Sequence, residues 1–423
     1  MTKIQTAKKY FVLSLSVILL IAFLTQCNSS SQPTASSSNI APSNTSSVTD
    51  ASDTTSVTSN ITYPSNYDLL PYEEKMSVIG HDFYIDEYKY VRDSALNVYT
   101  ENGFSFVLLS DTHIDYEGGE QPERPVIERE IETILELAKT AKIDCVILGG
   151  DLIHGTGGHF ASVTELEFFA SKFKDCAVPV LVARGNHDPN DYHGDVCNVN
   201  FIIDQTEWVD TLVDPVSKGK AVHDPNNPKS SYYYMDFPEK KTRVIVIDCY
   251  NYPVVSTKVF GISDWRAETW DSKADIEQWD WLASEAISAD LDGWKYVLAS
   301  HTPITSSHGF PASDIVKEIV SALNNGSKYT LSNGTVVNYS NYNSYIPLAI
   351  NGHTHVSSSK QNEDGKYLQI GVGSGKVSNR RKFGDISEAT FDLISLSDHG
   401  QAYRFDFGAG KDEQFDISKY IKQ

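Results

Sequence analysis

The chain has 423 residues, 22% of them charged and 40% hydrophobic, and its formal net charge at pH 7 is −21. Proteins that bind nucleic-acid polymers usually carry a basic surface, so we do not expect this acidic chain to act on one. Small anionic ligands are not excluded, because a local positive charge is enough to hold them.

The first 27 residues have the layout of an export signal. Three lysines (Lys3, Lys8 and Lys9) precede an apolar run from Tyr10 to Leu24. This run is short for a membrane-spanning helix, and a basic start followed by such a run is typical of a signal peptide. We therefore predict an exported protein.

Cys27 resembles the lipidated cysteine of bacterial lipoproteins, because it follows Leu-Thr-Gln at the end of the apolar run. The match is imperfect, since Gln26 stands where a small residue is usual. We predict a lipid anchor at Cys27, which would hold the protein on the extracellular face of the bacterial cell membrane. An ordinary secretion signal and an uncleaved anchor remain alternatives.

Residues 28–62 are dominated by Ser, Thr, Asn, Ala and Pro. Such a stretch cannot bury enough apolar surface to become ordered, so we predict a flexible linker. The remaining residues, 63–423, are predicted to form one large domain with insertions near 188–231 and 250–273. No role is assigned to residues 63–102 within it.

Ten apolar runs predict strands within this domain. The expected strands are 104–110, 144–149, 178–183, 232–237, 243–249, 295–300, 346–350, 366–372, 388–395 and 402–407. Apolar residues at three- and four-residue spacing predict helices at 123–141, 161–174 and 274–288. The early strands alternate with helices, which indicates parallel pairing, and the later strands follow one another closely, which indicates antiparallel pairing. The fold class is therefore α/β with mixed sheets.

Short polar motifs follow five of the predicted strands. The first, SDTH at 110–113, places Asp111 and His113 two residues apart, on one side of extended backbone. A carboxylate with an imidazole suits manganese, iron or zinc better than calcium. The second motif, GGD at 149–151, lets the chain turn sharply before Asp151. Each motif taken alone also fits a turn with a capping aspartate.

The third motif, GNHD at 185–188, is the most specific. Asn186 offers a neutral carbonyl oxygen to a metal ion, and His187 stands beside the site without binding the metal. We expect Asp188 to hydrogen-bond His187, orient it and raise its pKa, which would suit a general acid. An Asn-His-Asp turn on the surface is the alternative.

The last two motifs supply three more histidines. His301 ends a strand, and Pro303 prevents that strand from continuing. NGHTH at 351–355 repeats the two-residue spacing of the first motif in His353 and His355, and Gly352 permits close approach of the backbone. A lone histidine after a strand is usually structural, so His301 depends on the other motifs for its assignment.

In their order and spacing, these five motifs resemble the calcineurin-like metallophosphoesterase family, over residues 104 to about 356. The resemblance implies a four-layer α/β/β/α sandwich of two mixed β-sheets flanked by helices. It also implies hydrolysis of phosphate esters with two divalent metal ions (Mn²⁺, Fe²⁺/Fe³⁺ or Zn²⁺), in which a metal-bridging hydroxide attacks phosphorus.

Carried over by motif, the resemblance assigns seven ligands. It places the first metal on Asp111, His113, Asp151 and His355, and the second on Asp151, Asn186, His301 and His353. Asp151 would bridge the two ions. His187 matches the residue that protonates the leaving-group oxygen or stabilises the phosphate charge.

Departures from related subfamilies narrow the expected activity. GDLIHGT at 150–156 lacks the Asp and Arg of the protein-phosphatase pattern GDxxDRG, and His154 stands where purple acid phosphatases carry a Tyr. The stretch after His355 is too short for the second domain of secreted nucleotidases. The pattern is therefore most similar to single-domain bacterial phosphodiesterases, and we predict a small-molecule phosphoester substrate, with diesters favoured over monoesters.

A non-catalytic surface protein that binds a phosphorylated cell-envelope polymer or lipid head groups is the alternative function. Loss of metal ligands or of His187 would favour it, and none is lost. An adhesin in which the metals are purely structural is a third hypothesis, and the presence of His187 argues against it too.

The two insertions contain residues whose role stays open. Aromatic residues in 250–273 could stack on the substrate, but packing the loop down is the better interpretation. Five further histidines could line the pocket, but each is better interpreted as structural: His154, His159, His193, His223 and His308. Cys145 and Cys249 are predicted to be small buried apolar residues, and a bridge between Cys176 and Cys197 stays possible.

Overall fold

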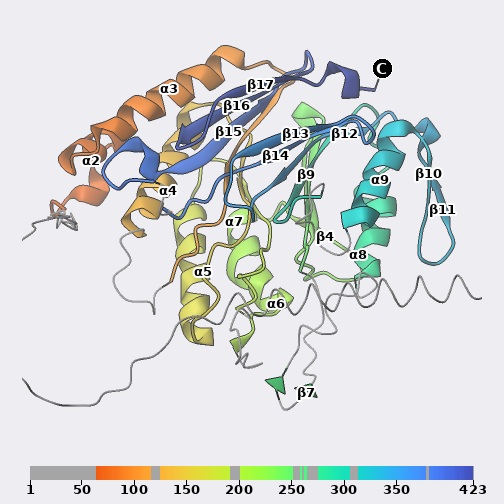
Figure 1. Cartoon of the computed structure of the whole chain (residues 1–423), viewed down its shortest axis with the longest axis horizontal. Coiled ribbons are helices and arrows are strands. Elements are labelled where there is room, and N and C mark those ends of the chain that lie inside the picture. Colours follow the sequence, from red (N-terminus) through yellow and green to blue (C-terminus); the bar gives the residue numbers. More distant parts are fainter. Residues whose placement is uncertain are drawn as a thin grey trace, which may run out of the picture. The chain divides into compact units, whose positions relative to one another are not determined.

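Two large mixed β-sheets form the centre of the protein (Figure 1). A computed structural model describes residues 63–115, 124–190, 201–250, 258–259, 262–263, 275–304, 313–377 and 381–422. The first sheet has six strands in the order β17-β16-β15-β1-β2-β3. They are β17 (Glu413–Asp416), β16 (Gln401–Gly408), β15 (Thr390–Leu396), β1 (Phe104–Leu109), β2 (Cys145–Leu148) and β3 (Val180–Val182). The strands β1, β2 and β3 are parallel, whereas β15 to β17 are antiparallel to their neighbours.

The second sheet has seven strands in the order β13-β14-β12-β9-β6-β5-β4. They are β13 (Ser358–Asn362), β14 (Tyr367–Gly371), β12 (Tyr345–Asn351), β9 (Lys295–Ser300), β6 (Thr242–Ile247), β5 (Tyr233–Phe237) and β4 (Val222–His223). The four strands β14, β12, β9 and β6 run parallel to one another. Two small hairpins complete the described strands: β7 (Lys258–Val259) with β8 (Ile262–Ser263), and β10 (Lys328–Thr330) with β11 (Val336–Asn338).

Alternation along the strands produces two apolar cores. In β9, Val297 and Ala299 belong to a core that both sheets share, and Tyr296 and Leu298 belong to a core on the other face of the second sheet. Side chains of a strand alternate between the two faces of its sheet, so one run of apolar residues fills both cores. The two sheets therefore pack face to face, with helices on their outer sides, which confirms the predicted sandwich.

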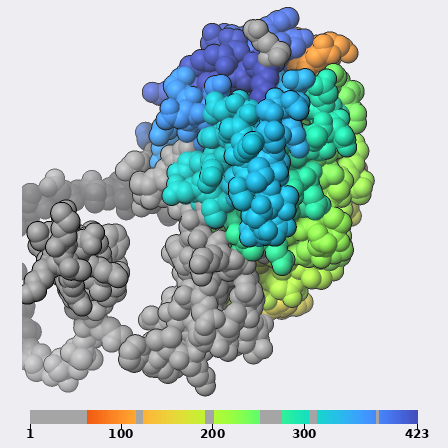
Figure 2. Space-filling view, turned by 90° about the vertical axis from the view of Figure 1, so that its right-hand side faces the viewer, coloured from red at the N-terminus to blue at the C-terminus, as the bar shows by residue number. Residues whose placement is uncertain are grey.

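The helices cover the outer faces of the two sheets. Their bounds are α2 (Tyr72–Val78), α3 (Asp82–Val98), α4 (Arg124–Thr140), α5 (His159–Phe173), α6 (Gln205–Trp208), α7 (Asp214–Ser217), α8 (Ile276–Trp281) and α9 (Ser313–Asn325). A π-helical turn, Val209–Val213, joins α6 to α7, and a second, Leu282–Ala286, extends α8. Figure 2 views the side on which α9 and the β10–β11 hairpin lie, where they form part of the surface.

The segment that the sequence left without a role covers the first sheet. In α3, Tyr84 packs against Phe407 of β16, with ring centroids 5.4 Å apart, and its hydroxyl donates to Glu388 at 3.1 Å. In α2, the Tyr72 hydroxyl lies 2.9 Å from that of Thr133 in α4. The helices α2 and α3 are thus part of the outer helical layer.

Three cysteines (Cys145, Cys176 and Cys249) are free thiols, and Cys197 lies outside the described residues. The predicted signal, the linker and the lipid anchor at Cys27 also lie outside them. Among the residues that the structure describes, none of the helices has the length and apolar character needed to cross a membrane.

Candidate metal centre

The five motifs meet at one edge of the sandwich, where β1, β2 and β3 of the first sheet end beside β9 and β12 of the second. These strands run parallel within their sheets, so their carboxyl ends lie on the same side. Loops at such strand ends are where α/β sheets usually place their ligands. The structure thus brings together all seven predicted metal ligands.

Four of these side chains form a first group: Asp111, His113, Asp151 and His355, with ligand atoms within 4.8 Å of one another. His355 Nε2 lies 3.2 Å from Asp111 Oδ1 and 3.0 Å from His113 Nε2. His113 Nε2 lies 3.7 Å from Asp151 Oδ2. Ligands about 2.1 Å from a metal ion stand roughly 3 Å from each other, so this group could hold one ion.

The second group contains Asp151, His301 and His353, again with ligand atoms within 4.8 Å. His301 Nε2 lies 3.2 Å from Asp151 Oδ2. Asn186 completes this group, since its Oδ1 lies 2.9 Å from His353 Nδ1. Asp151 belongs to both groups, which is the arrangement that a bridging carboxylate requires.

His301 tests whether the group fits a metal ion. Its Nδ1 donates to the Gly149 carbonyl at 2.8 Å, which turns Nε2 toward the ligand atoms. Nε2 is buried 3.2 Å from Asp151 Oδ2, but within the described part of the chain it makes no hydrogen bond of regular geometry. A histidine that donates one ring nitrogen to a backbone carbonyl and directs the other at neighbouring ligand atoms is typical of a metal ligand. The residues therefore fit the ions that the family implies.

Burial and neighbouring charges shift the pKa values of these side chains, and most of the shifts favour the protonation state that binds a cation. Burial lowers the pKa of His113 to about 3 and that of His353 to about 4, so both are neutral imidazoles at neutral pH. Burial also disfavours a charged His301, but the carboxylates of Asp151 and Asp111 outweigh it and raise its pKa to about 10. Burial disfavours ionised Asp151 too, but the surrounding imidazoles outweigh it and hold its pKa below the usual range.

Five of the ligand residues have left-handed backbone conformations. Their φ angles are 56° (Asp111), 45° (His113), 51° (Asp151), 68° (His353) and 56° (His355). A residue with a side chain pays roughly 1–2 kcal/mol to adopt this region. Strain of this kind concentrates at functional sites, because the surrounding packing must impose it.

Two glycines allow the loops to approach one another. A Cβ atom on Gly352 would lie 2.0 Å from Ser110 Oγ and 2.4 Å from Asp111 Oδ2. A Cβ atom on Gly185 would lie 2.2 Å from Asp151 Oδ1. Gly352 thus packs on the first motif, and Gly185 packs on the residue shared by both ligand groups.

Asp188 does not contact His187 as expected. Its carboxylate is fully buried and accepts hydrogen bonds from the backbone amides of Asp151 (2.9 Å), Leu152 (2.8 Å) and Gly185 (2.7 Å). Burial and the nearby Asp151 carboxylate raise its pKa to about 7. The prediction was wrong because several amides of the two turns converge on this carboxylate, so Asp188 shapes the loops and does not orient His187.

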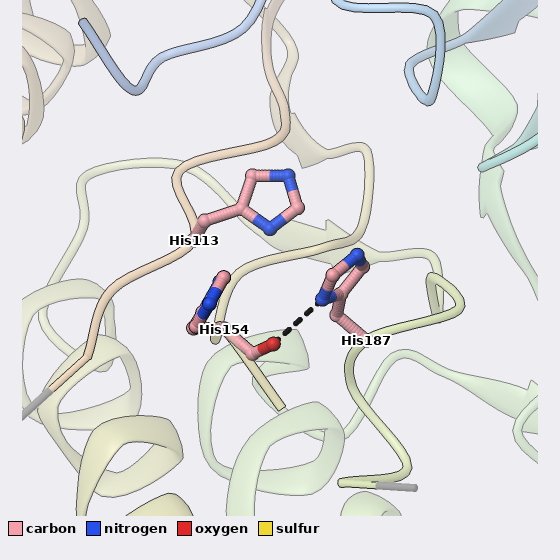
Figure 3. Close-up of side chains that lie close together, drawn as sticks. All are labelled: His113, His154 and His187. Atoms are coloured by element: carbon pink, nitrogen blue, oxygen red, sulfur yellow. Dashed lines mark hydrogen bonds between the residues drawn. The ribbon is translucent and has the colours of Figure 1, made fainter. Parts of the chain in front are cut away.

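The ring of His187 is oriented by the backbone of His154. His187 Nδ1 donates to the His154 carbonyl at 2.6 Å (Figure 3). The His187 amide donates to Asp151 Oδ1 at 2.8 Å. His187 Nε2 lies 3.9 Å from Asp151 Oδ2, at the edge of the ligand groups. The histidine of the third motif therefore directs Nε2 toward the ligand groups.

His154 lies at the site, although its sequence context was interpreted as that of a structural histidine. It lies beside His113 and His187, and the three rings offer ligand atoms within 4.8 Å of one another. Its position directly after GDLI was the sequence signal that could have placed it at the site. Of the other histidines considered, His159 contacts Glu207 at 2.8 Å and His223 contacts the Ser230 carbonyl at 2.7 Å. His193 and His308 lie outside the described residues.

Most of the second predicted insertion, 250–273, lies outside the described residues. Its first residue, Tyr250, lies near the site: the ring is 6.3 Å from that of His301, and the hydroxyl is 2.9 Å from Thr302 Oγ1. The described part of the first insertion forms α6, α7 and β4, and α7 contacts α5 and β3. This part packs beside the first sheet.

Comparison with known proteins agrees with this geometry. The sequence model of the calcineurin-like phosphoesterases matches residues 104–357. Among solved structures, a dimetal phosphatase from Danio rerio is 16% identical, with a TM-score of 0.51, over 74% of this chain and 99% of its own. A purple acid phosphatase from yellow lupin is 14% identical, with a TM-score of 0.41, over 75% of this chain and 53% of its own. No curated protein sequence matches the chain significantly.

Proposed function

Since the chain belongs to the calcineurin-like phosphoesterase family, we propose that it hydrolyses small phosphate esters with two divalent metal ions at the site described above. The observation that carries the proposal is the pair of ligand groups that share Asp151. In such a pair, the ions lower the pKa of bound water and offset the charge that develops on the phosphoryl oxygens.

The chain's own residues supply the remaining functions. Asp111, His113, Asp151 and His355 would hold one ion, and Asp151, Asn186, His301 and His353 the other. His187 Nε2 stands next to the shared carboxylate, where it would contact the phosphoryl group or the leaving-group oxygen. Its Nδ1 is tied to a backbone carbonyl, which keeps Nε2 directed at the site.

The finer specificity is part of the same proposal. We expect diesters to be preferred over monoesters, and we expect no activity on nucleic-acid polymers, because the chain carries a net charge of −21. The export signal and Cys27 support a location outside the cell, with the enzyme held on the membrane by lipid or released. Mass spectrometry of the mature amino terminus would test the anchor, and Cys27→Ser should release the protein from the membrane fraction.

Hydrolysis of bis-p-nitrophenyl phosphate and p-nitrophenyl phosphate tests the activity. Turnover should require added Mn²⁺ or another divalent ion, stop with chelator, and fall at least about a hundredfold in His187→Ala. His159→Ala is the matched control, since this histidine contacts Glu207 away from the ligand groups. The ratio of the two rates reports diester or monoester preference. Bound metal without turnover of either ester would instead favour a surface protein that only binds phosphorylated polymers or lipid head groups.

A further inference from the structure

A cavity of about 690 Å³ lies at the same edge of the sandwich as the candidate metal centre. The strand β14 runs parallel to β12, so its carboxyl end lies at the edge where the ligand-bearing loops meet. Antiparallel pairing brings the start of β13, the start of β15 and the end of β16 to this edge too. Residues at or close to these strand ends line the cavity, among them Ser358, Ser374, Thr390 and Gly410.

The cavity and the metal centre share His355. Its Nε2 lies 3.2 Å from Asp111 Oδ1 in the first ligand group, and the same residue lines the cavity. Ser374, also part of the lining, donates from its hydroxyl to the Asp111 carbonyl at 2.7 Å. A molecule whose phosphoryl group lies at the ligand groups therefore has room to extend past His355 into the cavity.

The charged side chains in the lining are mostly cationic. They are Arg381, Arg404, Lys411 and Glu413. Arg404 is compensated, because its guanidinium pairs with Asp392 at 2.8 Å and with Glu413 at 3.3 Å. Within the described part of the chain, neither Arg381 nor Lys411 has a carboxylate at ion-pair distance. The lining thus has an excess of positive charge.

Arg381 is partly buried without a carboxylate partner in the described residues. Its guanidinium donates to the Thr390 hydroxyl and to the backbone carbonyls of Gly375 (3.2 Å) and Lys376. Burial lowers its pKa, because the more distant carboxylates do not offset the lost hydration of the charge. Arginine stays charged at neutral pH all the same. An anion in the cavity would stabilise this charge.

The positive lining contrasts with the rest of the chain, whose net charge is −21. An acidic protein repels anionic molecules over most of its surface, so a local excess of cations favours anions at that place. Serine hydroxyls add neutral hydrogen-bond donors to the lining, from Ser357, Ser358 and Ser387. These donors and charges fit a phosphate or a carboxylate better than an apolar or cationic group.

We propose that this cavity binds a second anionic group of the substrate, so that the substrates are phosphate esters with a phosphate or a carboxylate on an ester substituent. The inference rests on the proposed function, because it takes the phosphoryl group that is cleaved to lie at the metal ions. Arg381 and Lys411 contact the second anion and determine specificity, whereas the ligand groups hold the ester that is cleaved.

Ligand binding to the metal-loaded protein, measured by calorimetry, tests this inference without relying on turnover. Butyl phosphate has one anionic end. 4-Phosphonooxybutanoate adds a carboxylate at the other end of the same chain, and butane-1,4-diol bisphosphate adds a phosphate. The two-anion ligands should bind at least about tenfold more tightly than butyl phosphate, the gain expected for one hydrogen bond between charged groups. Homologues with shorter and longer chains test the spacing of the two anions.

Substitutions in the lining show where the second anion binds. Lys411→Gln and Arg381→Gln each remove one positive charge and should remove most of the preference for two-anion ligands. Lys382→Gln is the matched control, because this exposed lysine lies next to Arg381 in the chain but not in the lining, so the preference should remain. Arg381 also holds two loop carbonyls, so the exposed Lys411 is the decisive position. Metal content by mass spectrometry should stay at two ions per chain in each variant.

Tighter binding of either two-anion ligand, lost in Lys411→Gln, supports the inference, and the tighter ligand identifies the second anion as phosphate or carboxylate. Equal affinity for one-anion and two-anion ligands at every chain length would overturn it. A preference that Lys411→Gln retains, or no binding of any ligand, would do the same.

Turnover of the p-nitrophenyl esters by the same preparation separates the two proposals. Turnover without a preference for two-anion ligands would reject only the present inference. A preference without turnover of either ester would reject the proposed function and leave the cavity as an anion-binding site.

Discussion

The ligand residues themselves carry most of the strain at this site. Asp111, His113, Asp151, His353 and His355 all adopt positive φ angles, a region that side chains normally avoid. In two of the motifs, two ligand residues with positive φ are separated by a single residue. In both, the intervening residue is a threonine, Thr112 or Thr354, so the strained positions alternate along the chain. The energy for this conformation must come from contacts with other loops.

Gly352→Ala should disrupt the site through one added carbon. The new Cβ would lie 2.0 Å from Ser110 Oγ and 2.4 Å from Asp111 Oδ2, so the two loops must separate. We expect bound metal, measured by mass spectrometry, to fall below one ion per chain. Gly334→Ala is the control, because its φ of +84° makes the substitution strained, but nothing lies within 4 Å of the new atom. Equal metal content in the two variants would contradict this interpretation.

The loops after β2 and β3 depend on one buried carboxylate. Asp188 accepts hydrogen bonds from amides of both loops, and in Asp188→Asn the side-chain NH₂ group would replace one of the accepting oxygens. We expect the free energy of unfolding in urea to fall by about 1–3 kcal/mol, with weaker metal binding. Normal stability with an altered acid limb of the pH–rate profile would instead show that Asp188 acts on His187.

The contact between α4 and β15 should make stability depend on pH. Glu130 is fully buried in α4, its Oε1 accepts from the Thr390 amide at 2.7 Å, and burial raises its pKa to about 8. The charged groups that face it are Arg381, Glu388 and Arg129. Between pH 4.5 and about 8, Glu130 therefore keeps a proton in the folded state that it has lost in the unfolded state.

The contribution of Glu130 is therefore present below pH 4.5 and is lost as the pH rises toward 8. Glu130→Gln removes the titration and keeps the shape. The slope of unfolding free energy between pH 5 and 8 should become less negative by up to ~1.4 kcal/mol per pH unit. Denaturant unfolding at several pH values measures it, with Glu128→Gln as a surface control. An unchanged slope would mean that Glu130 is ionised in the folded state.

The two sheets of the molecule meet at the candidate metal centre. Three ligand-bearing loops come from the first sheet and two from the second, and Asp151 joins the two ligand groups. Metal ions that bind only the folded protein stabilise it by mass action, by about 2.7 kcal/mol at a hundredfold excess over the dissociation constant. The ions should therefore act as a link between the sheets.

Removing the metals should lower the melting temperature by about 5 °C or more, and re-adding Mn²⁺ should restore it. Calorimetry with and without chelator measures the shift, and mass spectrometry confirms that the ions have left. Gly352→Ala provides a matched sample, because chelator should change its melting temperature little. An unchanged melting temperature in the metal-free protein would show that the apolar core alone holds the sheets together.

The sequence was informative where signals are local. Runs of β-branched and apolar residues marked the central strands, and the polar residues that follow them marked the ligands. Edge strands such as β13, with the sequence SSKQN, carry no apolar pattern and form by pairing with a neighbour. The helix α9 does have a helical pattern in its sequence, with Val316, Ile319, Val320 and Leu323 at helical spacing, but it is not among the predicted helices.

The sequence by itself determined the class of fold, the family and the candidate ligand residues, because each strand and the motif behind it are encoded by adjacent residues. Tertiary structure decided how these residues meet. It tied Asp188 to backbone amides, oriented His187 through the carbonyl of His154, and imposed left-handed backbone on the ligands. These features arise from contacts between loops that are distant in the chain, and no local pattern records which loop will supply a partner.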